Sequence, residues 1–103
     1  MKERRFFVYM MASRAKFGAI YVGSTQDILR RSAQQAGEAV GGAAWPLRYQ
    51  ACRLVWFEEC GDYEQMRRRE VQLKKWRRVW KVELISSRNP TWTDLRGDLG
   101  KMI

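Results

Sequence analysis

The sequence contains no histidine, only two cysteines and two prolines, and no long apolar run. Without histidine, a zinc site with soft ligands is close to excluded. Cys52 and Cys60 lack a CxxC spacing and are too few for a disulfide scaffold, so the cytoplasm is the expected compartment. No stretch approaches the roughly 20 apolar residues of a membrane span. The short apolar run at 6–12 also lacks a signal-peptide cleavage pattern.

Acidic residues are scarce relative to basic ones. Eleven Asp and Glu stand against 20 Lys and Arg, which gives a formal net charge of +9. Such an excess favours a polyanionic partner, because each phosphate that is neutralised releases condensed counterions. Two alternatives are a basic protein without a nucleic-acid partner and a membrane-surface protein. The clustering of the charge along the chain favours nucleic acid.

The length and the apolar content predict one folded domain. A chain of 103 residues that is 46% apolar has room for one hydrophobic core and not for two. There is no internal repeat and no low-complexity linker. We therefore expect a single domain over residues 1–103, with a core of about 6–95.

Three apolar runs predict strands, at 5–11, 18–23 and 52–58. The short link between the first two favours an antiparallel hairpin with Tyr9 and Tyr21 in neighbouring strands. Alternation places Tyr9 on the face opposite Val8. The segment between the second and third runs is expected to contain a helix to about Gln35, N-capped by Ser24 or Thr25, then a loop at 37–44 and irregular chain around Pro46.

A helical pattern begins at Asp62 and reaches about Trp80, with a plausible break at 76–78. More helix is expected at 82–85, ended by 86–90. Trp92 and Leu95 are expected to pack onto the body, and the chain from Gly97 onward is expected to fray.

One face of this helix carries an unusual acid. Spacings of three and four place Glu70 on the same face as Tyr63, Met66, Leu73 and then Trp76 or Arg77. Glu70 is the only acid between Gln65 and Arg78, and a partly buried carboxylate is costly unless it is paired or holds a metal. From the helix alone, pairing with a neighbouring arginine is the preferred interpretation.

The charged residues that surround Glu70 on this helix are almost all basic, and Trp76 and Trp80 lie among them. This mixture suits contact with phosphates better than ion pairing along a helix. The tryptophans themselves are expected in the core rather than as base-stacking surfaces. The predicted nucleic-acid contacts are Arg30, Lys74, Lys75, Arg77, Arg78 and Lys81.

Several fragments together resemble the GIY-YIG nuclease superfamily, in particular its small stand-alone bacterial members. Residues 8–10 (VYM) and 21–23 (YVG) resemble the paired signature, and residues 24–31 resemble the helix that follows it. Residues 69–78 resemble the segment with the metal-binding glutamate, and 81–95, including NPTW at 89–92, resemble the end of such proteins. The resemblance covers about 6–95, with four elements in the family's order and spacing.

The resemblance implies an α/β fold of the α+β type, with a three-stranded antiparallel sheet flanked by helices and the site on one sheet face. Glu70 would ligate one Mg²⁺ or Mn²⁺ that binds the scissile phosphate. Arg31 would donate to a phosphate oxygen, and Tyr9 and Tyr21 would flank the attacking water with pKa values lowered by cationic neighbours. Asn89 would orient Glu70 or the backbone.

One position departs from the family. Many members have a histidine one helical turn after the arginine, where this chain has Gln35, and an amide is no general base at neutral pH. The proton would then leave through a tyrosine or to solvent, or activity has been lost. Ser24 and Thr25 stand where some relatives have a lysine.

The expected function is therefore a metal-dependent endonuclease that hydrolyses phosphodiester bonds in DNA and is directed by backbone and shape rather than by sequence. The alternatives are a nucleic-acid-binding module of the same fold with weak or lost catalysis, and a basic structural protein. RNA stays open as a substrate. A monomer is expected, with no membrane and no obligate protein partner.

Overall fold

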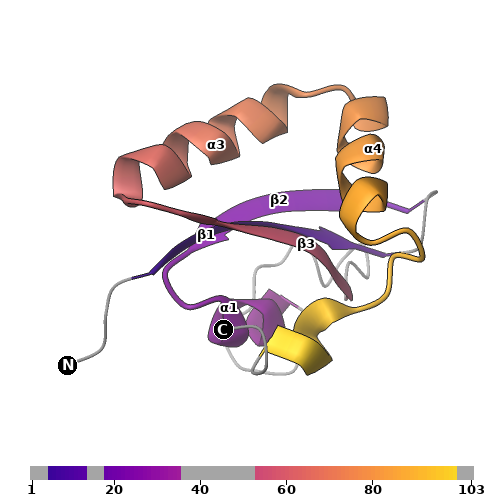
Figure 1. The fold of residues 1–103 in the computed structure, drawn as a ribbon, viewed down its shortest axis with the longest axis horizontal. Coiled ribbons are helices and arrows are strands. Elements are labelled where there is room, and N and C mark those ends of the chain that lie inside the picture. Colours follow the sequence, from indigo (N-terminus) through magenta and orange to yellow (C-terminus); the bar gives the residue numbers. More distant parts are fainter. Residues whose placement is uncertain (1–4, 14–17, 36–52, 100–103) are drawn as a thin grey trace.

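The computed structural model describes residues 5–13, 18–35 and 53–99, and for 33–35 the backbone alone. Its three strands are β1 (Phe6–Ala12), β2 (Ile20–Thr25) and β3 (Arg53–Cys60). They form one antiparallel sheet in the order β2-β1-β3. The helices are α1 (Ile28–Gln35), α3 (Tyr63–Lys75), α4 (Arg78–Arg88) and the short 3₁₀ helix η1 (Leu95–Asp98). The α+β fold with a three-stranded antiparallel sheet is thereby confirmed (Figure 1).

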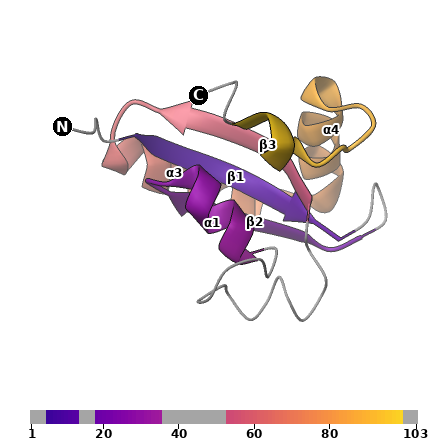
Figure 2. The same cartoon turned by 90° about the horizontal axis from the view of Figure 1, so that it is seen from below.

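Helices cover both faces of the sheet. α3 and α4 lie on one face, and α1 and η1 lie on the other (Figures 1 and 2). Because successive side chains of a strand point to opposite faces, the central strand β1 contributes to two separate cores. Val8 and Met10 pack with Met66, Leu73 and Ile85 of the first layer. Phe7, Tyr9 and Met11 pack with Ile28 and Leu99 of the second. The predicted alternation along β1 is confirmed.

The break between α3 and α4 falls at Trp76 and Arg77, as the sequence predicted. Asp62 caps the start of α3 by accepting a hydrogen bond from the Gln65 N–H at 2.8 Å. Trp76 and Arg77 then adopt extended ψ angles of 147° and 150°, and α4 leaves in a new direction. Trp76 packs against the core there. Tyr63, which was expected on the buried face of α3, is 55% exposed because it occupies the first turn, beyond the sheet-covering stretch from Met66.

The start of α1 differs from the expectation. The cap is Asp27, whose carboxylate accepts from the Arg30 N–H at 3.2 Å and whose carbonyl accepts from the Arg31 N–H at 2.9 Å. Thr25 instead closes a turn before the helix, with its hydroxyl oxygen 3.0 Å from the Asp27 N. The carboxylate of Asp27 therefore binds the free N–H group at the start of the helix, in place of the expected hydroxyl of Ser24 or Thr25. The predicted loop at 37–44 and Pro46 lie outside the described residues.

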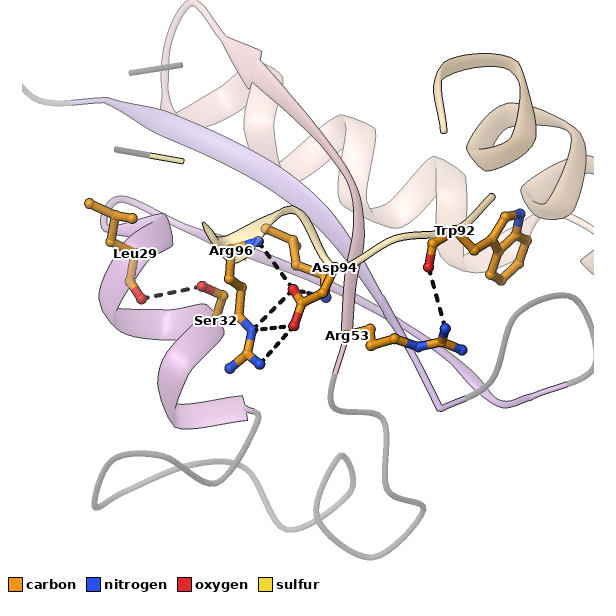
Figure 3. Close-up of polar contacts among 7 residues, drawn as sticks. Leu29, Ser32, Arg53, Trp92, Asp94 and Arg96 are labelled. Carbon is orange, nitrogen blue, oxygen red and sulfur yellow. Dashed lines mark hydrogen bonds and ion pairs between the residues drawn. The ribbon is translucent and has the colours of Figure 1, made fainter. Parts of the chain in front are cut away.

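The C-terminal segment closes the outer edge of β3. The β1–β3 pairing has a β-bulge between Met10 and Met11, where Val55 has no partner in β1. The Leu54 N–H donates to Asp94 at 3.2 Å, and Asp94 also accepts from Arg96. Figure 3 shows this group, with Arg53 donating to the carbonyl of Trp92 at 3.4 Å. These bonds satisfy an edge that would otherwise be open to pairing with another chain.

Trp92 holds the same segment onto the core. It has a left-handed φ of 54°, which is costly for a bulky side chain. The cost is offset because its ring is completely buried and its indole N–H donates to the Ser86 hydroxyl at 2.9 Å. Trp92 and Leu95 therefore pack onto the body as expected. The expected fraying from Gly97 is wrong as far as Leu99, whose side chain is fully buried. Within the described residues, no helix is long and apolar enough to cross a membrane.

Candidate active site

The two tyrosines of the predicted signature lie side by side on the α1 face of the sheet. The rings of Tyr9 and Tyr21 have their centroids 6.3 Å apart, at an interplanar angle of 48°. Tyr9 pairs with Gly23 in the sheet register, and a Cβ atom at Gly23 would lie 2.6 Å from the Tyr9 Oη and 3.0 Å from Tyr21 Cε2. A glycine is therefore required at this point so that both rings can close over the strand.

Glu70 lies on the other face of the sheet, against β2. Its Oε1 accepts hydrogen bonds from the Ser24 hydroxyl at 2.6 Å and from Arg67 Nη1 at 2.7 Å. Lys74 Nζ lies 2.9 Å from its Oε2. The Glu70 residue is only 6% exposed, whereas the side chains of Arg67 and Lys74 are 52% and 53% exposed. The carboxylate is thus held from inside by Ser24 and covered from outside by two half-exposed cations.

The surroundings keep Glu70 ionised. Burial raises the pKa of its carboxyl group, but hydrogen bonds from Ser24 and Lys74 and the charges of Lys74 and Arg67 outweigh burial. The net result is a pKa below the ordinary value. The pairing that the helix alone favoured is present, with Arg67 and also with Lys74. Glu70 is therefore an anion at neutral pH with both oxygens turned toward donors.

The resemblance implied a site on one face of the sheet, but the tyrosines and Glu70 pack on opposite faces. Tyr9 and Tyr21 pack on the α1 side, whereas Ser24 pairs with Val8, whose side chain belongs to the α3 side. The reason is the two-residue period of a strand, which turns Ser24 away from Tyr21 and Gly23. β2 is an edge strand of this sheet, however. The acid and the phenols therefore approach four consecutive residues, 21–24, from opposite sides of one sheet edge.

Arg31 lies on α1, on the phenol side of the sheet. It is partly exposed, one turn beyond Ile28, whose buried side chain packs in the same core as Tyr9. Arg30, next to it, is exposed. The Gln35 side chain, at the position where a general base was considered, lies outside the described part of the structure. α1, which carries Arg31, thus lies on the face of the sheet to which the tyrosines belong, and α3, which carries Glu70, lies on the other (Figure 1).

Asn89 has a structural position. Its Nδ2 donates to the carbonyl oxygens of Val55 at 3.0 Å and Thr93 at 2.9 Å. Its Oδ1 accepts from the N–H of Thr93 at 3.1 Å and from the Thr93 hydroxyl at 3.2 Å. These four bonds use the two donors and two acceptor sites of an amide. Of the two roles considered, orienting Glu70 or orienting the backbone, these contacts correspond to the second.

The predicted nucleic-acid contacts fall on two surfaces. Arg30 lies on α1, and the other five lie across the sheet, on α3, on α4 and, for Arg77, at the N-cap of α4. Among these five, Arg78 donates to the Gly18 carbonyl, and Arg77 stacks 6.0 Å from the centroid of the Trp80 ring. Burial and the nearby charge of Arg78 lower the pKa of Lys81. The cationic surface therefore lies mainly around Glu70 and the start of α4.

Two residues have roles that the sequence did not predict. Ser24 donates directly to Glu70, although the sequence suggested it only as a helix cap and as a residue that replaces a lysine of some relatives. The alternation of side chains along the strand could have predicted this contact, because it turns Ser24 to the face opposite Tyr21 and Gly23. Trp80 was expected in the core and is 48% exposed. Trp76, by contrast, is partly buried against the core, as expected.

The oxygen donors beside Glu70 suit one kind of metal. Within the described ranges there is no group of three or more His, Cys, Asp or Glu residues that could enclose an ion. A single ionised carboxylate with an adjacent hydroxyl oxygen matches a hard, largely hydrated cation such as Mg²⁺ or Mn²⁺, which often binds proteins through one or two carboxylates. It does not match a zinc site, which would need three or four nitrogen, sulfur or carboxylate ligands.

Comparison with known protein families gives a match over the part of the chain that contains β1, β2, α1, β3 and α3. The model of the GIY-YIG catalytic domain matches residues 5–83, most of the chain. This range includes both tyrosines, Arg31 and Glu70, and ends within α4, before Asn89. No curated protein gives a significant match. No solved structure does so either. The chain therefore belongs to the GIY-YIG family of nuclease catalytic domains.

Proposed function

We propose that this protein is a metal-dependent endonuclease that hydrolyses phosphodiester bonds in DNA. The observation that carries the proposal is Glu70, an ionised and nearly buried carboxylate fixed by Ser24 beside the tyrosine-bearing edge strand, in a surface of cations. A buried anion of this kind is costly to maintain for stability alone. Its position next to residues 21–24 makes it the candidate ligand for one Mg²⁺ or Mn²⁺ ion.

Each side chain has a distinct part in the proposed reaction. Glu70 and the Ser24 hydroxyl would hold the ion, which when bound supplies positive charge to the scissile phosphate. Because Arg67 and Lys74 are more than half exposed, they can turn from the carboxylate to phosphate oxygens. Arg31 would donate its guanidinium to the phosphate from the α1 side of the edge.

The proton of the attacking water requires a separate route, because the sequence has no histidine. Tyr9 is 1% exposed, whereas Tyr21 is partly exposed at the sheet edge. We therefore assign the position beside the water to Tyr21 and a supporting position behind it to Tyr9. The proton would pass through the Tyr21 oxygen or directly to solvent.

A second candidate function is a nucleic-acid-binding module with weak or lost catalysis. It is favoured by Gln35 at the position of the usual base and by the ion pairs that occupy Glu70. Both candidates recognise backbone and shape, since no element resembles a sequence-reading module. DNA is the proposed partner, RNA the alternative, and one chain acts alone.

A nicking assay on supercoiled and branched DNA, with Mg²⁺, with Mn²⁺ and with chelator, separates the two. Glu70→Ala should abolish cleavage while DNA binding is preserved or tightened, because a negative charge leaves the surface. Glu64→Ala is the matched control: it removes an exposed acid of the same helix that pairs with Arg68. Cleavage by Glu70→Ala at the wild-type rate would refute the metal role. Binding without cleavage by the wild type under every condition would establish the second candidate.

A further inference from the structure

The start of α4 presents an exposed aromatic ring within a mainly cationic surface. Trp80 is 48% exposed, which is unusual for the largest side chain in a small domain. Its ring meets Trp76 edge to face, with centroids 6.1 Å apart at 89°, and Arg77 lies 6.0 Å from its centroid. Trp76 is itself packed against the core. The Trp80 ring is therefore held by Trp76 and Arg77 in a residue that is about half exposed to solvent.

The charge around this ring identifies the kind of partner. Cations dominate this part of the chain: Lys74, Lys75, Arg77, Arg78 and Lys81 stand between Val71 and Val82, and Glu83 is the exposed acid that follows. A protein partner would have to be strongly acidic to approach, whereas nucleic acid supplies both the anion and a flat aromatic surface. Proteins that bind single strands combine exposed aromatic rings, on which bases stack, with cations that contact the backbone. Trp80 with its neighbouring cations has this combination, and Arg77 lies over one face of the ring.

We propose that Trp80 is a stacking platform for an unpaired nucleobase. In a duplex the faces of internal bases are covered by their neighbours, so only single-stranded segments, flaps and frayed ends can offer a free face. The substrate class is thus nucleic acid with unpaired bases next to the cleaved backbone. This inference rests on the proposed function, because it names the substrate of the same domain, but binding at Trp80 does not require that cleavage occurs.

The test measures binding in the presence of chelator, so that catalysis plays no part. Three labelled DNAs are compared by fluorescence anisotropy: a blunt duplex, the same duplex with a single-stranded extension, and the same extension built from abasic sugar-phosphates. The abasic extension keeps every phosphate and removes every base. The proteins are wild type, Trp80→Ala, Trp80→Phe and the matched control Val79→Ala, whose side chain on the same helix is 53% exposed.

Trp80→Ala should weaken binding to the base-containing extension by about 5- to 150-fold, the range for one lost stacked base. Binding to the blunt duplex and to the abasic extension should change less than about 2-fold, because the charges are kept. Trp80→Phe should recover part of the loss, and Val79→Ala should bind like wild type. Trp80→Leu, which keeps apolar contact with Trp76 but has no ring, should lose as much as Trp80→Ala, so a packing defect is distinguished from lost stacking.

Equal weakening of all three DNAs by Trp80→Ala, or no weakening of any, would overturn the proposal. So would a Trp80-dependent association with vesicles of anionic lipid accompanied by unchanged DNA binding, which would assign the ring to a membrane surface. Absence of cleavage in the nicking assay together with base-dependent binding through Trp80 would refute the nuclease proposal and leave the platform standing.

Discussion

Replacement of Asn89 by alanine tests whether this residue supports the fold or the chemistry. The change removes four hydrogen bonds to the backbone and side chain of Thr93 and to the Val55 carbonyl. Thr93 is exposed, so its groups can bond to water instead. Val55 is completely buried, so its carbonyl oxygen loses its partner at a cost of about 1–3 kcal/mol. With a smaller loss at Thr93, we expect Asn89→Ala to reduce the free energy of unfolding by about 2–4 kcal/mol.

A loss of this size lowers the melting temperature by at least about 8 °C in a domain of this length. Urea unfolding followed by circular dichroism gives the free energy directly. Thr93→Val is the matched control, because it removes only the hydroxyl bond to Asn89 and should cost less than about 1 kcal/mol. If Asn89→Ala unfolds within about 0.5 kcal/mol of wild type, the structural assignment is refuted. If the same variant also loses cleavage, Asn89 belongs to the chemistry.

Two further predictions follow from the contacts of the site. Gly23→Ala should destabilise the fold by about 1–3 kcal/mol, because its Cβ would lie 2.6 Å from the Oη of the buried Tyr9. Urea unfolding measures the change. Stability equal to that of the wild type would contradict the prediction, because it would show that the rings of Tyr9 and Tyr21 can move aside at no cost. The pKa values of Glu70 and Asp94 are both lowered in the folded state, so their stabilising contributions are complete above the unfolded values and lost as the pH falls through the folded ones. Stability should therefore decrease below about pH 4–5, and a flat profile from neutral pH to pH 3 would contradict the assigned ion pairs.

Local pattern predicted most of the strands and helices, whereas the three-stranded sheet was implied by the resemblance to the GIY-YIG family. The alternation of Phe7, Tyr9 and Met11 against Val8 and Met10 is the pattern of a central strand between two cores, and the structure confirms it. Strand ends shifted by one or two residues, since pairing partners decide where a ladder stops. The capping of α1 by Asp27 was missed because Ser24 and Thr25 are equally good capping residues by type, and only the path of the chain distinguishes them.

The site was harder to predict than the fold. Spacing along α3 correctly singled out Glu70 as the acid on the buried face. It could not show that Ser24 would supply the inner hydrogen bond, because that contact joins residues 46 positions apart. The exposure of Trp80 was missed for a similar reason. The sequence placed a break at 76–78 but could not give the direction of the helix beyond it, which the extended backbone at Trp76 and Arg77 sets.

The dependence of the site on the register of β2 connects the fold to the chemistry. Tyr21 and Gly23 face the tyrosine side of β2, and Val22 and Ser24 face the Glu70 side. The pairing of Tyr9 with Gly23 therefore determines which residues lie on each side. A slip by one residue would turn Ser24 toward the tyrosines, remove the inner partner of Glu70 and bring a side chain against Tyr9. An edge strand has only one neighbour to set its register. In this protein the buried side chain of Val22 on one face, and the close fit of Tyr9 over Gly23 on the other, supply the additional constraint. The glycine that admits the tyrosine ring is therefore also the residue that aligns Ser24 with the acid.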